Sequence, residues 1–293
     1  MRSVLTICIA LTVTFVYGQS TEDLKRLEEF KRKVNMPVVL PKSEKVHIRI
    51  TKDLVYDPSK DTSQKMDVYQ PVSTVKKEKL PLVVFVHGKT PIKTNPKNWG
   101  GYISWGELTA SKGYVSITFT QSLGTPGRSI DEAGSDLQHA LTYIKANHLL
   151  YNIDTNKIAL LAYSAGVPLL SSALQQNQNN IRCLGAFYGF IDIKNIDMWK
   201  HESQASLTKF SLIDHLGKDK AFTPLFIARA GKENNKGLNE TIDSFILKAN
   251  NTNINLTFIN HPEGVHGFDT QNNDERSREV IESVFTFLQY HLR

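Results

Sequence analysis

The feature that most constrains this chain is the stretch over residues 157–170, KIALLAYSAGVPLL. An apolar run suited to a buried strand passes directly into a helix-forming run, and Ser164 lies at the junction. This order is typical of a nucleophile elbow, a tight turn that holds a serine at the N-terminus of a helix. Such a turn needs small side chains two residues to either side, and Ala162 and Gly166 meet that need. The five central residues by themselves do not distinguish a catalytic serine from an ordinary serine in a loop between a strand and a helix.

The rest of the chain predicts the sheet that such an elbow requires. Apolar runs without alternation are typical of strands covered on both faces, as in a parallel sheet. Six such runs occur, at 82–86, 114–119, 158–161, 183–187, 225–227 and 256–259. Segments with period-two alternation at 47–56 and 65–69 predict an antiparallel pair. Helical periodicity appears at 130–144, 242–249 and 281–288. We therefore expect one α/β domain, with a mainly parallel twisted sheet of about eight strands, helices on both faces and the antiparallel pair at its N-terminal edge.

The first 18 residues differ from the rest and predict export. Arg2 precedes an apolar run over 4–16 and then small residues, as in a secretory signal peptide cleaved after about Gly18. A retained anchor is the alternative, although the run is shorter than the ~20 residues that span a bilayer. We expect a signal peptide over 1–18, an N-terminal helical extension over 19–45 with an amphipathic helix at 20–34, and the α/β domain over 46–293. The protein is then secreted, with no membrane span.

Cysteine content and charge exclude other classes of protein. Cys8 leaves with the signal peptide, so Cys183 has no partner and is expected to be a buried, inert thiol. The formal net charge of +6 is spread along the chain, without the basic stripe of a nucleic-acid-binding surface. No metal-binding motif and no complete phosphate-binding loop occurs, so neither a metal nor a cofactor is expected.

Catalysis by a serine needs a base, a carboxylate that holds the base, and donors for the developing oxyanion. In an open parallel sheet these groups are sought beyond the carboxyl ends of the strands. The backbone N–H groups of Lys89 and Ala165 are the candidate donors. Glu233 is the first carboxylate after the strand at 225–227, and His266 lies in a glycine-flanked loop after the last strand.

From about Met66 onward the chain resembles the α/β-hydrolases of the dienelactone-hydrolase and secreted-esterase kind. Three motifs carry the resemblance: LVVFVHG, the elbow AYSAG, and the closing HPEGVHGF. The resemblance implies that Ser164 is the nucleophile, His266 the general base and Glu233 the acid. It also implies that residues 46–293 form an α/β-hydrolase domain that cleaves a small-molecule carboxylic ester through an acyl-enzyme. The serine argues against dienelactone hydrolase activity itself, which uses a cysteine.

Several alternatives stay open at this point. The acid of this family is more often an aspartate, so Asp243 and Glu240 compete with Glu233, and His261 competes with His266. His87 is interpreted as a brace for the oxyanion loop. A serine peptidase on the same fold and a non-catalytic binding protein are the alternative functions. The irregular segment at 189–223 is either a lid or structural packing, and loops such as 90–105 and 189–223 are expected to shape the substrate pockets.

Three sequons offer sites for N-linked glycans in a secreted protein, at Asn239, Asn250 and Asn255. Asn239 has an alternative role as a cap of the helix that contains Ile242. Asn250 is assigned to a polar loop and is the favoured site of the three.

Overall fold

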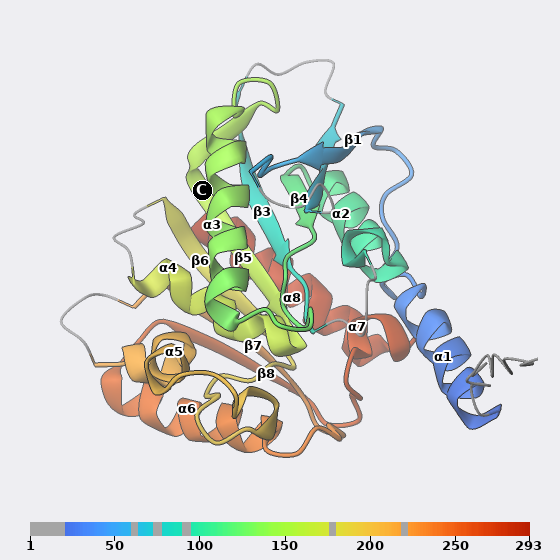
Figure 1. The fold of residues 1–293 in the computed structure, drawn as a ribbon. Helices are drawn as coiled ribbons and strands as arrows, with labels where there is room; N and C mark the ends of the chain where they lie inside the picture. Colours follow the sequence, from blue (N-terminus) through green and yellow to red (C-terminus); the bar gives the residue numbers. More distant parts are fainter. Residues whose placement is uncertain (1–20, 60–63, 73–77, 90–94, 176–179, 218–221) are drawn as a thin grey trace, which may run out of the picture.

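The computed structural model describes residues 21–59, 64–72, 78–89, 95–175, 180–217 and 222–293. An eight-stranded sheet runs through this part of the chain (Figure 1), in the order β1-β2-β4-β3-β5-β6-β7-β8. Its strands are β1 (Ile48–Val55), β2 (Lys65–Pro71), β3 (Leu80–Val86), β4 (Val115–Phe119), β5 (Ile153–Tyr163), β6 (Ile181–Phe187), β7 (Leu225–Ala230) and β8 (Leu256–His261). Only the pairings of β2 with β1 and with β4 are antiparallel. The predicted sheet and its antiparallel edge are confirmed.

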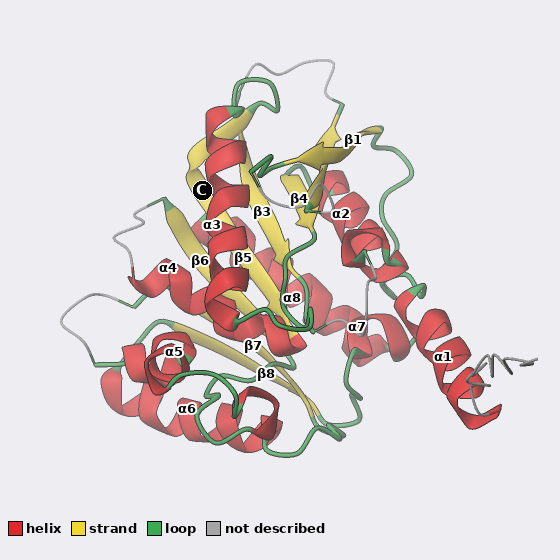
Figure 2. Ribbon diagram, in the orientation of Figure 1, coloured by secondary structure: helices red, strands yellow, loops and turns green. Residues whose placement is uncertain are grey.

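Helices cover both faces of this sheet (Figure 2). They are α1 (Thr21–Val34), α2 (Gly100–Ser111), α3 (Ile130–Ala146), α4 (Ser171–Gln175), α5 (Gln204–Phe210), α6 (Leu238–Thr252), α7 (Phe268–Gln271) and α8 (Glu275–His291). The described ranges also contain four 3-10 segments, η1 (Pro96–Asn98), η2 (Ser164–Leu170), η3 (Asp197–Trp199) and η4 (Leu212–His215). The single α/β domain with helices on both faces is therefore confirmed.

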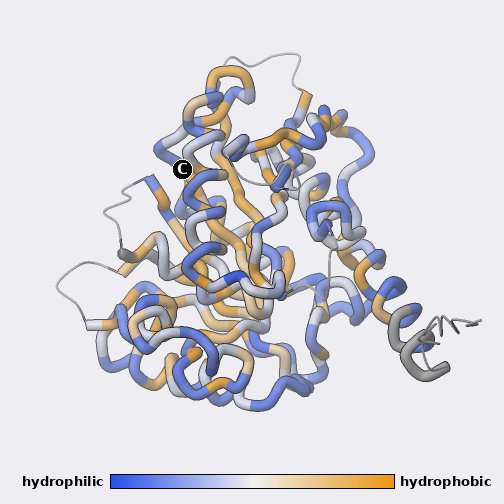
Figure 3. The backbone as a smooth tube through the Cα atoms, viewed as in Figure 1, coloured by the Kyte–Doolittle hydropathy of each residue, from blue (hydrophilic) through white to orange (hydrophobic). Residues whose placement is uncertain are grey.

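Two apolar cores explain why the inner strands lack alternation. Side chains along a strand point alternately to opposite faces, and here both faces are buried. Val84 belongs to the core that also contains residues of α3 and α6, whereas its neighbour Phe85 belongs to the core that also contains residues of α2 and α8. The strands accordingly form an apolar band through the middle of the molecule (Figure 3). Cys183 is fully buried in the second core as a free thiol, and burial raises its pKa.

The helix expected over 20–34 is present as α1, which begins at Thr21. The predictions for residues 1–20, including the signal peptide, Cys8 and the helix-starting Ser20, lie outside the described residues. Across the described ranges, no helix combines the length and the apolar character needed to cross a membrane.

The predicted pocket loop over 90–105 is wrong in its C-terminal part, because α2 begins at Gly100. The backbone of Asn35 packs against the first residue of this helix, Gly100. A Cβ at Gly100 would lie 2.2 Å from the carbonyl oxygen of Asn35. Residues 90–94 of this predicted loop are outside the described part of the chain.

The segment over 189–223 is packed into the first core along much of its described length. Phe190 and Trp199 are buried and contact each other edge to face, with ring centroids 5.0 Å apart. Phe210 of α5 belongs to the same core. This burial favours the structural interpretation over a lid for the residues described here.

Candidate functional site

The carboxyl ends of β3, β5, β6, β7 and β8 converge on one edge of the sheet, and Ser164 lies there at the end of β5. Its backbone adopts the left-handed conformation, with φ of 54°, which is uncommon for a residue with a side chain. The turn also needs a glycine two residues later, because a Cβ at Gly166 would lie 2.3 Å from the carbonyl oxygen of His87. This is the strained strand-to-helix geometry of a nucleophile elbow.

His266 connects Ser164 to a carboxylate by two hydrogen bonds. Its Nε2 lies 2.9 Å from the Oγ of Ser164, and its Nδ1 lies 2.5 Å from Oε2 of Glu233. The short Nδ1 contact assigns the ring proton to Nδ1, because an ionised carboxylate only accepts hydrogen bonds. Nε2 is then free to accept the hydroxyl proton of Ser164.

Glu233 is held by a set of donors that keep it ionised. Its side chain is 1% exposed, and Oε1 accepts hydrogen bonds from the backbone N–H groups of Asn234 and Asn235 at 2.8 Å. Burial alone raises the pKa of such a carboxyl, but the hydrogen bond and charge of His266 and the amides of Asn235 outweigh it. The pKa of Glu233 is therefore lowered.

The β7 and β8 strands approach closely enough to bring Glu233 and His266 together. Gly231 N donates to His261 O at 2.8 Å, and Lys232 N donates to Gly264 O at 2.9 Å. A Cβ at Gly231 would lie 2.1 Å from the carbonyl oxygen of Pro262, so the approach depends on glycine there.

The competing candidates from the sequence are engaged elsewhere. Asp243 forms an ion pair with Arg229 on the surface, with Nε and Oδ1 3.0 Å apart. Glu240 is an exposed residue in the first turn of α6. The Nε2 of His261 lies 3.0 Å from the Oγ of Ser277. The structure thus brings Ser164, His266 and Glu233 together and none of these rivals.

His87 braces the loop that carries the candidate oxyanion donor Lys89. Its Nδ1 lies 2.7 Å from Gly88 O, and its Nε2 accepts the backbone N–H of Gln121 at 3.0 Å. Burial is the main reason that the pKa of His87 falls to about 4. A neutral ring with its proton on Nδ1 satisfies both contacts. Gly88 packs against Ser164, because a Cβ there would lie 2.9 Å from the serine Cβ.

Tyr188 and Asp269, which the sequence did not single out, lie near His266: Tyr188 contacts its ring, and Asp269 holds Tyr188. Tyr188 follows β6 directly, and its ring lies edge-on to His266 with centroids 4.9 Å apart. Its hydroxyl donates to the buried Asp269 at 2.6 Å, and Trp105 Nε1 donates to the same carboxylate at 2.7 Å. Burial raises the pKa of Asp269, and these two hydrogen bonds only partly oppose it. A signal was available for Tyr188, which follows a buried strand at the same edge of the sheet.

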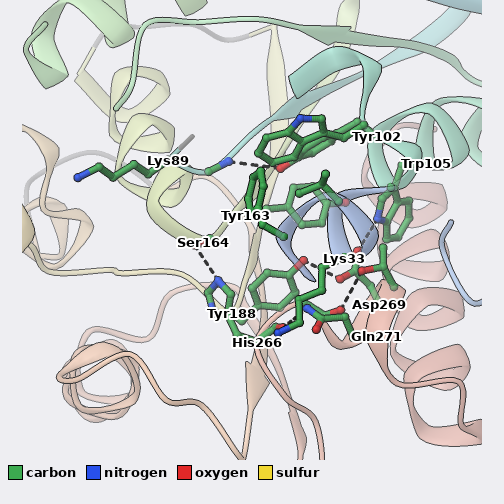
Figure 4. A pocket seen from close by; sticks show the side chains of 17 residues that line it. Lys33, Lys89, Tyr102, Trp105, Tyr163, Ser164, Tyr188, His266, Asp269 and Gln271 are labelled. Carbon is green, nitrogen blue, oxygen red and sulfur yellow. Dashed lines mark hydrogen bonds between the residues drawn. The ribbon is translucent and has the colours of Figure 1, made fainter. Parts of the chain in front are cut away.

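A cavity of about 270 Å³ opens beside Ser164 (Figure 4). Aromatic side chains form much of its lining, among them Tyr102, Tyr163 and Tyr188, and Asp269 and His266 also contribute. Among the described residues, no group of three His, Cys, Asp or Glu side chains is placed to hold a metal ion.

The three sequons lie in different environments. The side-chain nitrogen of Asn239, to which a glycan would be attached, donates to Ala230 O at 2.9 Å. The cap of α6 is Gly237 rather than Asn239, so the capping role is wrong. Asn250 and Asn255 are both exposed. The loop assignment of Asn250 is also wrong, because α6 continues to Thr252.

A comparison with models of protein families identifies the family of this chain. The model of the family named BD-FAE matches residues 66–224, more than half of the 293 residues. The chain belongs to the BD-FAE family. This is an α/β-hydrolase-type esterase family, as the motif resemblance implied, and membership supports carboxylic ester hydrolysis by the present member. A comparison with curated proteins finds no match.

Solved structures similar to this BD-FAE member share its fold at low sequence identity. Esterase B from Lactobacillus rhamnosis is 14% identical, with a TM-score of 0.73 and coverage of 91% of each chain. Esterase Est22 is 16% identical, with a TM-score of 0.68, over 93% of this chain and 89% of that one. A putative dipeptidyl aminopeptidase IV from Bacteroides ovatus is 16% identical, with a TM-score of 0.66, over 84% of this chain but 36% of its own. The α/β-hydrolase fold is confirmed.

The lowered pKa of His87 predicts an acid-sensitive fold. The ordinary pKa of histidine is 6.5, so below that pH His87 binds a proton in the unfolded chain. In the folded protein His87 stays neutral until the pH falls to about 4. Stability is therefore lost as the pH falls through this window, by about 2 kcal/mol between pH 7 and pH 5 for this group. Urea unfolding at the two pH values measures the loss, and His87→Gln is expected to remove that part of it. The control His201→Gln alters a side chain that is 63% exposed and should keep the wild-type pH dependence. An unchanged pH dependence in His87→Gln would contradict the assignment.

Proposed function

We propose that this protein is a secreted serine esterase that cleaves carboxylic esters through an acyl-enzyme. The observation that carries the proposal is the continuous path of hydrogen bonds from Glu233 through His266 to Ser164. Membership of the BD-FAE family supports the same reaction. The proposed substrate is a small-molecule ester, and the chemistry needs no cofactor.

In the first half of the reaction, the Oγ of Ser164 attacks the ester carbonyl carbon while its proton passes to Nε2 of His266. The carboxylate of Glu233 stabilises the imidazolium that forms and holds its ring in position. The carbonyl oxygen becomes an oxyanion, which accepts hydrogen bonds from the N–H groups of Lys89 and Ala165. His266 then returns the proton to the leaving alkoxide, and the alcohol departs from an acyl-Ser164 ester.

In the second half, water replaces the alcohol. His266 removes a proton from water as its oxygen attacks the acyl carbon, and the same donors stabilise the second oxyanion. Collapse breaks the bond to Ser164, whose oxygen recovers the proton from His266. One ester and one water give one acid and one alcohol, with the enzyme regenerated.

The positions of the candidate donors agree with this mechanism. Ala165 follows the nucleophile directly and is the second residue of η2 (Ser164–Leu170), so its N–H lies at the N-terminal end of a helical segment, where backbone donors favour negative charge. Lys89 follows Gly88, which packs against the Ser164 side chain. The brace by His87 fixes the carbonyl of Gly88, so the adjoining peptide group has a defined orientation.

Replacement of the nucleophile is the most direct test. Ser164→Ala is expected to abolish hydrolysis of a short p-nitrophenyl ester and covalent labelling by an alkyl phosphonate, because no oxygen remains to attack. One form of the similar Esterase B carries a tributyrin phosphonate inhibitor, which makes this a suitable probe class. Ser135→Ala is the matched control, because Ser135 is an exposed residue of α3. This variant should keep both ester hydrolysis and phosphonate labelling. Normal phosphonate labelling of Ser164→Ala would refute the proposal, and a wild-type protein inert to esters and phosphonate would favour the binding protein. Cleavage of dipeptidyl p-nitroanilides instead of esters would favour the peptidase.

The acid is tested separately. Glu233→Gln keeps the shape of the side chain but replaces the carboxylate that stabilises the imidazolium. We expect kcat/KM for p-nitrophenyl acetate to fall by about 100- to 10,000-fold. Asp243→Asn, which alters the rival carboxylate on the surface, should retain wild-type kcat/KM. If the two variants exchange these outcomes, the acid is Asp243.

Secretion forms the second part of the proposal and is supported by the pattern of residues 1–18. Expression of the full chain in a eukaryotic secretory cell should release a protein whose N-terminal residue, read by sequencing, is close to Gln19. Glycosidase treatment should reduce its mass if Asn250 or Asn255 carries a glycan, and removal of both sequons should abolish that change. Retention of residues 1–18 in the cell-associated protein would contradict cleavage.

A further inference from the structure

The cavity beside Ser164 has an outer wall that belongs to the N-terminal extension. Phe30, Lys33 and Val34, all near the end of α1, line the same cavity as Ser164 and His266. Figure 4 shows Lys33 among the side chains that line this cavity. The amphipathic helix expected in the N-terminal extension therefore contributes directly to the cavity beside Ser164.

Four contacts attach this wall to the domain. The ring of Phe30 meets Trp99 edge to face, with centroids 5.6 Å apart, and the backbone of Asn35 packs on Gly100. Just beyond them, Val38 N donates to the Oγ of Ser104 at 2.8 Å, and Val39 N donates to Asp269 O at 2.8 Å. The end of α1 and the residues after it thus contact both α2 and α7, and each of these two helices also contributes residues to the cavity lining.

Two charged side chains that line the cavity, Lys33 and Asp269, have protein partners. The Nζ of Lys33 lies 2.8 Å from Oε1 of Glu29, one turn earlier in α1. The carboxylate of Asp269 accepts hydrogen bonds from Tyr188 and Trp105. Aromatic rings and the side chains of Phe30 and Val34 therefore dominate what a ligand would contact. Such a lining favours an uncharged, apolar group.

The volume limits the size of that group. Pockets for drug-sized ligands measure roughly 300–1,000 Å³, and the present cavity of about 270 Å³ lies just below that range. It suits an unbranched chain of several carbons better than a bulky group. Each buried methylene strengthens binding by up to about four-fold.

We propose that this cavity is a subsite for the apolar chain of the ester and that α1, through Phe30 and Val34, sets the chain length that fits. The inference rests on the proposed esterase function and adds a substrate class to it, namely esters that carry a medium-length alkyl chain next to the scissile bond. The chain belongs either to the acid or to the alcohol, and in either case it contacts the same apolar lining.

Chain-length selectivity of the full-length protein tests this subsite. In the acyl series, p-nitrophenyl acetate, butyrate, hexanoate and octanoate are compared; in the alcohol series, ethyl, butyl, hexyl and octyl acetate. Val34→Phe fills the outer cavity and is expected to lower the ratio of kcat/KM for the six-carbon ester to that for the two-carbon ester at least ten-fold, mainly through KM. Phe30→Ala enlarges the cavity and should raise the eight-carbon to six-carbon ratio. The series that responds identifies which part of the ester occupies the subsite.

Lys31→Ala is the matched control, because Lys31 lies in the same helix, pairs with Glu28 and does not line the cavity. It should leave every ratio within two-fold of the wild type. If Val34→Phe and Phe30→Ala also keep the wild-type ratios in both series, the subsite assignment is overturned. Absence of any ester hydrolysis by the wild-type protein would instead refute the proposed function, so the two failures are distinguishable.

Discussion

Close packing of backbone against backbone at the end of β5 is the constraint on which the site depends. The turn there holds Ser164 in a left-handed conformation, which costs on the order of 1–3 kcal/mol. The surrounding structure tolerates this cost because η2 is buried almost throughout and β5 pairs with β3 and β6 on either side. Gly166 allows the turn to press against His87 O. A larger residue would push apart the two loops that meet the substrate.

Two buried carboxylates near His266 behave in opposite ways, and their partners explain the difference. Burial by itself acts to raise the pKa of both carboxyl groups. Glu233 faces His266 and the amides of Asn235, which favour the ionised form strongly enough to lower its pKa. Asp269 faces the neutral donors of Tyr188 and Trp105, and its pKa stays raised. Glu233 is therefore suited to stabilise positive charge on His266, whereas Asp269 anchors the aromatic wall of the cavity.

The N-terminal segment joins the rim of the cavity on the side of Asp269. Val39 hydrogen-bonds to the backbone of Asp269, and Phe30 contacts Trp99, so a helix far from Ser164 in sequence becomes part of the same rim. Its contacts are side-chain packing and single hydrogen bonds rather than strand pairing. None of the α1 side chains that the structure describes belongs to either apolar core.

The sequence by itself determined the sheet and the position of the elbow at Ser164, because strand burial, helical periodicity and turn chemistry depend on neighbouring residues. It favoured His266 through the motif resemblance, and the structure places that histidine, and not His261, at the Oγ of Ser164. Only the tertiary structure decided that Glu233, rather than Asp243 or Glu240, meets His266, since that depends on how closely β7 approaches β8. The same holds for Asp269, for the start of α2 at Gly100 and for the position of α1. Each of these depends on contacts between residues far apart in the chain, which leave no periodic pattern along it.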